Sequence, residues 1–63
     1  MAPTEESKAA AEAVKAEANA LFQGKNFREA YAKYSDAIAL DDTNAVLFAN
    51  RAACSLELQE YDS

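Results

Sequence analysis

The chain has 63 residues and a formal net charge of −5, from 11 acidic and 6 basic side chains. This balance lacks the clustered lysine and arginine that nucleic acids and anionic membranes require, so neither is an expected partner. The single cysteine, Cys54, and the lack of histidine exclude an internal disulfide and a Cys/His metal site. No histidine is present to activate a nucleophile either. We therefore expect no cofactor and no enzymatic activity, and the lack of a targeting segment favours a cytoplasmic protein.

The first helix is predicted to run from about residue 4 to residue 23. Thr4 can cap it, and Glu5 and Glu6 lie where the helix dipole favours negative charge. Residues 1–12 are expected to form a frayed helical extension, because the apolar positions there are nearly all alanine. An apolar stripe is expected at helical spacing, formed by Ala10, Val14, Ala18, Leu21 and Phe22.

Gly24-Lys25-Asn26 forms the first predicted break. Gly24 can take the left-handed backbone angles that end a helix, and Asn26 tolerates them too. The second helix is predicted from about residue 27 to residue 40. Its buried face includes the i, i+3, i+4, i+7 pattern and consists of Phe27, Ala30, Tyr31, Tyr34, Ala37, Ile38 and Leu40.

The second predicted break, residues 41–44, is rich in side chains that bond to their own backbone. A third helix should then run from about residue 45 to residue 60. Cys54 stands among alanines and is expected to be a small buried residue. One side of this helix is expected to carry Val46, Leu47, Ala49, Ala53, Leu56 and Glu60.

Three helices joined by short links predict an all-α fold, an antiparallel helical hairpin followed by a third helix. A test for repetition supports this prediction. Shifting the chain by 34 places lays Val14 on Phe48 and Phe27 on Tyr61, and it also lays alanine 18 on alanine 52. Two large apolar pairs and one small pair therefore coincide.

This pattern resembles the tetratricopeptide-repeat (TPR) family, whose hairpins carry large and small apolar residues at fixed places. Glu17 and Asp42 depart from the family pattern. The resemblance covers about residues 14–61 and implies about one and a half repeats of an α-solenoid, so that residues 1–63 form a partial TPR domain that binds proteins. The family's places are occupied here by Val14, Glu17, Ala18, Leu21, Ala30, Tyr34 and Asp42.

The resemblance also implies a ligand site on the concave face of the stacked repeats. Lys15 and Asn19, spaced i, i+4, share one side of the first helix, and Asn50 lies on the equivalent helix of the next repeat. These residues look like part of the carboxylate clamp of co-chaperone TPR domains. That clamp binds the acidic C-terminal peptide Glu-Glu-Val-Asp of heat-shock chaperones, with the lysine pairing with a carboxylate and the amides donating to the terminal carboxyl group. Phe22 and Arg51 are further possible peptide contacts, although Phe22 equally suits the core and Arg51 better suits support of a neighbouring helix or an ion pair.

Other functions remain open at this point. The chain could be a general TPR scaffold for other partners or for self-assembly, or the regulatory leader of a phosphatase or peptidyl-prolyl isomerase. Two more basic residues of the clamp would come from a third repeat, roughly thirty residues beyond Asn50. We therefore expect a fragment of a longer protein, with very weak peptide affinity of its own. Because stacked repeats need neighbours, the isolated chain is expected to be partly folded or to self-associate through its third helix.

Overall fold

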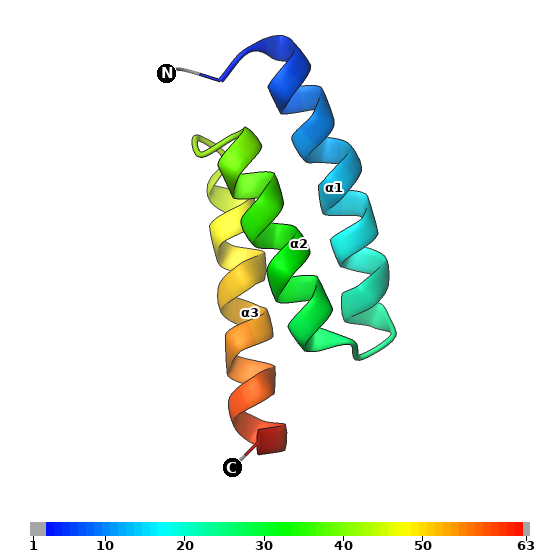
Figure 1. Ribbon diagram of the computed structural model, residues 1–63. Coiled ribbons are helices and arrows are strands. Elements are labelled where there is room, and N and C mark those ends of the chain that lie inside the picture. The colour runs from blue at the N-terminus through cyan, green and yellow to red at the C-terminus, as the bar shows by residue number, and fades with distance from the viewer. Residues whose placement is uncertain (1–2, 63) are drawn as a thin grey trace.

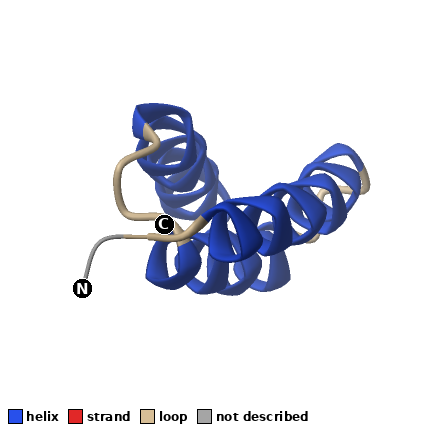
Figure 2. Cartoon of the chain, turned by 90° about the horizontal axis from the view of Figure 1, so that it is seen from above, coloured by secondary structure: helices blue, strands red, loops and turns tan. Residues whose placement is uncertain are grey.

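The computed structural model describes residues 3–62, and the side chains of residues 3–60, as three helices joined by two short links. Helix α1 spans Glu5–Gln23, α2 spans Phe27–Leu40 and α3 spans Ala45–Asp62. Successive helices run in opposite directions, and α2 packs against both α1 and α3 (Figure 1). All regular structure in the described range is helical (Figure 2). The predicted hairpin plus third helix is confirmed.

Helix α1 begins with a reciprocal hydrogen-bonded cap. The Ser7 backbone N–H donates to Thr4 Oγ1 at 3.1 Å, and the Thr4 backbone N–H donates to Ser7 Oγ at 2.8 Å. Serine here fills the role that glutamate or glutamine usually has in a capping box. The predicted cap at Thr4 is confirmed, and the helix is continuous from Glu5. The expected fraying over residues 1–12 stays a prediction, and residues 1 and 2 of it lie outside the described range.

The link between α1 and α2 corrects the predicted position of the left-handed residue. Gly24 has φ −81° and Asn26 has φ −88°, whereas Lys25 has φ 65°. The Asn26 N–H donates to Leu21 O at 2.8 Å and the Lys25 N–H donates to Phe22 O at 3.0 Å. This paired bonding is a Schellman motif, which requires the left-handed conformation at the residue that follows the last helical cap. Here that residue is Lys25, one position after the glycine.

The core lies between α2 and its two neighbours. Ala18, Ala30 and Ala37 are fully buried, so they let the helices approach closely, and the rings of Phe27 and Tyr34 fill the space beside them. The sequence had placed all five residues on the apolar faces of their helices. The predicted burial of the single cysteine is also confirmed. The buried cluster consists of Ala11, Ala18, Ala30, Tyr34, Ala37, Leu47 and Cys54.

Three of the predicted helix faces are partly wrong. In α1 Ala10 is exposed and Ala11 takes its buried place. In α2 Tyr31 lies at the edge of the packed face and is 39% exposed. In α3 Val46 and Leu56 are 52% and 65% exposed, and alanine 49 and glutamate 60 are exposed as well.

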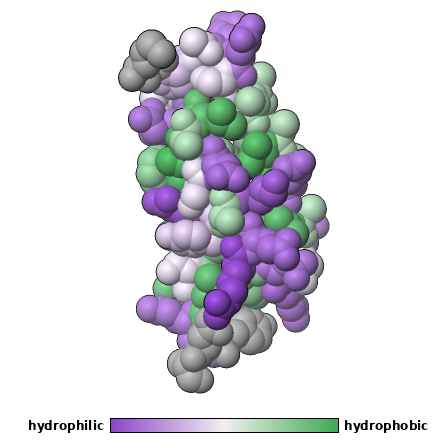
Figure 3. All heavy atoms as spheres, viewed as in Figure 1, coloured by the Kyte–Doolittle hydropathy of each residue, from purple (hydrophilic) through white to green (hydrophobic). Residues whose placement is uncertain are grey.

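The error in α3 has a simple cause. Val46, Leu47 and Phe48 follow one another and point in three directions around the helix, so hydrophobicity alone does not select a face. The face of α3 that packs against α2 carries Leu47 and Cys54, which are seven residues apart and fully buried. Apolar side chains therefore remain at the surface among polar ones (Figure 3).

The link between α2 and α3 is held by its own side chains. Asp41 is almost fully buried, and its Oδ1 accepts from the Thr43 N–H at 3.2 Å and from Thr43 Oγ1 at 2.5 Å. Asn44 Oδ1 accepts from the Val46 N–H at 3.0 Å and so caps the start of α3. The predicted break is confirmed. The side-chain hydrogen bond from Thr43 is the main reason that the pKa of Asp41 lies below its ordinary value.

Candidate functional site

A hollow of about 190 Å³ lies where the three helices face one another. Asn19 and Phe22 reach it from α1, Tyr34 from α2 and Asn50 from α3. The remaining lining residues are Gln23 and Ala53. The structure therefore brings the two predicted asparagines into one site, although 31 positions separate them in the sequence. Most of the hydrogen-bonding groups around this hollow are carboxamides.

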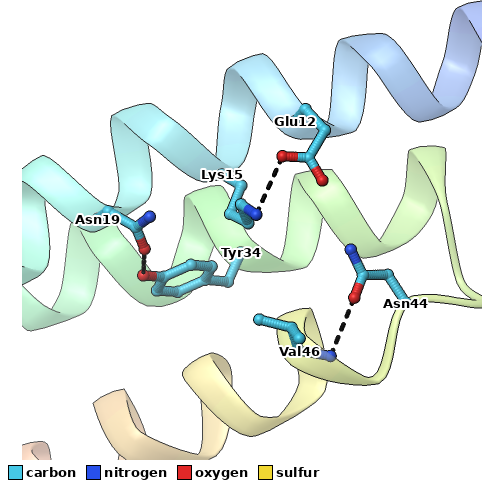
Figure 4. A network of polar contacts seen from close by, with 6 residues as sticks. All are labelled: Glu12, Lys15, Asn19, Tyr34, Asn44 and Val46. Atoms are coloured by element: carbon cyan, nitrogen blue, oxygen red, sulfur yellow. Dashed lines mark hydrogen bonds and ion pairs between the residues drawn. The ribbon is translucent and has the colours of Figure 1, made fainter.

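The carboxamide of Asn19 is oriented by a residue on the neighbouring helix. The Tyr34 hydroxyl donates to Asn19 Oδ1, and Figure 4 shows the two side chains meeting between α1 and α2. Burial, and next the nearby Cys54 thiol, raise the pKa of the Tyr34 phenol, so the phenol is protonated and able to donate at neutral pH. With its carbonyl oxygen used in this way, Asn19 keeps its NH₂ group, which can only donate.

Lys15 lies one helical turn before Asn19 on the same side of α1, about 6 Å away along the helix axis. Its Nζ is 3.0 Å from Glu12 Oε2 (Figure 4). The Lys15 side chain is 25% exposed and that of Glu12 is 58% exposed. Lys15 does not line the hollow itself, so it would hold a group that extends beyond the hollow along α1.

Phe22 belongs to both the core and the hollow. Its ring meets the Phe27 ring edge-on, with 5.1 Å between centroids and 75° between the planes. It also packs against the buried cluster and lines the hollow. Both readings of Phe22 that the sequence allowed are therefore compatible with its position.

Arg51 faces away from this site. Its guanidinium lies over the rings of Tyr31 and Phe48, at 5.5 Å and 5.6 Å from their centroids, and its Nη1 donates to Ser35 Oγ at 3.4 Å. The contacts with Tyr31 and Ser35 join α3 to α2, and both ring contacts use the charge in cation–π interactions. The structure thus places Arg51 where it supports a neighbouring helix, and does not bring it to the hollow that Asn50 lines.

The sequence did not reveal the role of Tyr34 in the site. Tyr34 was predicted as a core residue, and the residue is indeed only 2% exposed. A buried tyrosine usually finds a partner for its hydroxyl, which was the one available signal. The identity of that partner, 15 residues earlier on another helix, depends on how α1 and α2 pack.

The described part of the chain was also searched for metal ligands and for membrane-spanning helices. Its Cys, Asp and Glu side chains form no group of three or more that could hold a metal ion. None of its helices is long and apolar enough to cross a membrane.

Comparison with known proteins agrees with the class that the fold defines, that of helical-hairpin repeat proteins. The chain is 44% identical over 57 residues to Small glutamine-rich tetratricopeptide repeat-containing protein 2 of Saccharomyces cerevisiae, covering 90% of the chain and 16% of that protein. It is 47% identical over 51 residues to Hsp70-Hsp90 organizing protein 1 of Glycine max, covering 81% of the chain and 9% of that protein. It is 42% identical over 55 residues to Hsp70/Hsp90 co-chaperone CNS1 of Saccharomyces cerevisiae, covering 81% and 14%.

The chain belongs to the tetratricopeptide-repeat family, and it resembles the TPR regions of co-chaperones. It spans between 9% and 16% of the length of these three relatives. No family model matches the chain. No solved structure matches it at a significant level.

Proposed function

We propose that this chain is a protein-interaction module of the co-chaperone type, which binds the acidic C-terminal peptide of a heat-shock chaperone. The observation that carries the proposal is the meeting of Asn19 and Asn50 in one hollow, with Lys15 one turn away. Two relatives are named for Hsp70 and Hsp90, which supports chaperones as the partner class. Such a role involves no enzymatic activity. Because its proposed partners are chaperones of this kind, we also propose that the protein acts in the cytoplasm.

The chemistry of these three side chains suits a carboxylate. The terminal carboxylate of a peptide offers two oxygens that only accept hydrogen bonds, and the carboxamides of Asn19 and Asn50 can both donate. Lys15 adds one positive charge for an acidic side chain of the peptide. Hydrogen bonds to a carboxylate are roughly twice as strong as neutral ones. Against this, the chain carries a net charge of −5, which opposes an acidic ligand.

We therefore expect weak binding by this chain, with a Kd on the order of 1 mM, equivalent to about −4 kcal/mol. Weak binding of this kind is measurable by two-dimensional NMR on the ¹⁵N-labelled chain. The ligand is a peptide ending in Glu-Glu-Val-Asp, and the same peptide with an amidated C-terminus is its control. The side-chain amide signals of Asn19 and Asn50 should shift with the free acid and much less with the amide.

Variants test which groups carry the binding. Lys15→Ala and Asn50→Ala should each reduce the affinity for the free acid by about tenfold or more, the loss of one charge-assisted hydrogen bond. Lys33→Ala is the matched control, because Lys33 also pairs with a glutamate, Glu17, at 3.4 Å, and does not line the hollow. Unchanged affinity in both Lys15→Ala and Asn50→Ala would rule out the proposed clamp.

A second candidate is self-association, which the exposed apolar residues of α3 favour. Phe48 is 42% exposed, Val46 and Leu56 are more so, and the three side chains have no covering helix within the described residues. Sedimentation of the chain across a range of concentrations tests this. A monomer at every concentration, with a cooperative melt, would remove this candidate.

A further inference from the structure

The position of Tyr34 suggests that it does more than fill the core. Tyr34 as a whole is 2% exposed, yet it lines the hollow, and its hydroxyl donates to Asn19 Oδ1 (Figure 4). The bond joins α2 to α1 at the residue that lines the hollow. The Asn19 carboxamide is therefore held by a rigid, buried partner on a different helix.

The direction of this hydrogen bond fixes which end of the carboxamide meets a ligand. A protonated phenol has one hydrogen to donate, and a carboxamide accepts only through its oxygen. If the Asn19 carboxamide were turned round, its NH₂ group would face the hydroxyl, and the phenol hydrogen would lose this acceptor. Leaving a buried donor unsatisfied is costly. The favoured arrangement keeps the oxygen on Tyr34 and leaves the NH₂ group for the hollow.

We infer that Tyr34 is a positioning residue, which holds Asn19 as a hydrogen-bond donor and so makes the hollow select peptides with a free terminal carboxylate over peptides with a terminal amide. A carboxylate offers two acceptor oxygens to the donors of the hollow, whereas a terminal amide offers one oxygen and brings an NH₂ group of its own. With the Asn19 NH₂ group fixed as a donor, the amide therefore satisfies fewer donors than the carboxylate does. Specificity then arises from rejection of the wrong group as much as from attraction of the right one. The inference about the ligand rests on the proposed function, but the positioning of Asn19 does not.

The positioning is tested first without any ligand, by NMR relaxation of the asparagine side-chain amides. Asn26 is the internal reference, because its side chain is exposed and makes no capping hydrogen bond. In the unmodified chain the Asn19 NH₂ group should be more ordered than that of Asn26. Tyr34→Phe keeps the ring but removes the hydroxyl, and it should lower the order of Asn19 to that of Asn26. Equal mobility in the unmodified chain, or no change in Tyr34→Phe, would overturn the positioning.

Selectivity is tested next, by titrating the free-acid and amidated peptides into each variant. Tyr34→Phe should weaken binding of the free acid about five- to tenfold and leave binding of the amide nearly unchanged. Tyr31→Phe is the control, since Tyr31 lies on the same helix and does not line the hollow. In an Asn19→Ala background, Tyr34→Phe should have no further effect, because Tyr34 acts through Asn19. Additive losses in that double variant would contradict the inference.

A third variant covers the case in which Tyr34→Phe fails to fold. Asn19→Asp keeps an oxygen for the Tyr34 hydroxyl but replaces the donor group with a second acceptor. It should reverse the preference, so that the amidated peptide binds more tightly than the free acid. A retained preference for the acid would overturn the selectivity. If the unmodified chain binds neither peptide, the proposed function and the selectivity fail together, and the ligand-free spectra still decide the positioning.

Discussion

The α1–α2 hairpin and helix α3 are stabilised in different ways. The hairpin is closed by fully buried alanines, with two aromatic rings beside them. Helix α3 is held mainly through one face, where Leu47 and Cys54 are fully buried, and its other sides leave large apolar groups exposed. The hairpin is therefore sensitive to added volume, whereas α3 is sensitive to lost volume. This difference gives four predictions, in order of decreasing expected effect.

Leu47→Ala should destabilise the packing of α3 by about 3 kcal/mol, because it removes the largest fully buried aliphatic side chain that holds α3 on α2. Urea unfolding followed by circular dichroism would measure the loss. Val46→Ala, at the adjacent exposed position, is the control and should change stability by less than about 0.5 kcal/mol. Equal effects in the two variants would show that α3 does not pack through the Leu47 face.

Ala30→Leu should destabilise the hairpin by about 2 kcal/mol, since the extra atoms have no space between α1 and α2. The same change at Ala49, which is exposed on α3, should be close to neutral. Both variants can be compared by thermal melts. A stable Ala30→Leu variant would mean that the two helices are not in close contact at this point.

Lys25→Gly should stabilise the hairpin by up to about 1 kcal/mol. Lys25 has φ 65°, a conformation that is strained for a side chain and easy for glycine. Gly24→Ala is the companion change, because Gly24 has an ordinary φ and an added Cβ would lie 3.4 Å from the Asn26 side-chain amide. It should be tolerated. If Lys25→Gly lowers stability and Gly24→Ala abolishes folding, the left-handed residue has been placed wrongly.

Two neighbouring aspartates in the link between α2 and α3 should respond differently to acid. In the folded chain the pKa of Asp41 is lowered, chiefly by the Thr43 hydrogen bond, so its carboxylate contributes stability at pH values above its ordinary pKa of 3.8. That contribution is lost as the pH falls through the lowered value. Asp41→Asn should remove this part of the acid sensitivity, whereas Asp42→Asn, at an exposed position, should not. Unfolding midpoints measured between pH 2 and pH 6 would compare the two variants.

Much of this fold follows from local sequence, and the errors have two origins. Thr4 and the break at residues 41–44 act through neighbouring backbone groups, so the helix bounds could be predicted closely. The faces of α1 and α3 depend on the partner helix, and both predictions failed in detail there. The left-handed residue was misplaced because the Schellman hydrogen bonds, and not the presence of glycine, determine its position.

The candidate site also has parts that could be predicted from the sequence and parts that could not. Lys15, Asn19 and Asn50 could be proposed from their spacing and from the family resemblance. The support that Arg51 gives to α2 was also expected, although its partners Tyr31 and Ser35 were not identified. The hydrogen bond from Tyr34 could not be predicted, because it depends on side chains from two helices. Asn50 and Arg51 are neighbours in the sequence, yet one lines the hollow and the other lies between two rings outside it.

The ion pair between Lys15 and Glu12 has a consequence for how binding would depend on salt. An acidic side chain that binds Lys15 must first displace the Glu12 carboxylate, so binding exchanges one anion for another. Added salt weakens the internal pair and the new pair alike. Affinity should therefore fall less steeply with ionic strength than for an unpaired lysine, and Glu12→Gln should make the salt dependence steeper while tightening binding in dilute buffer.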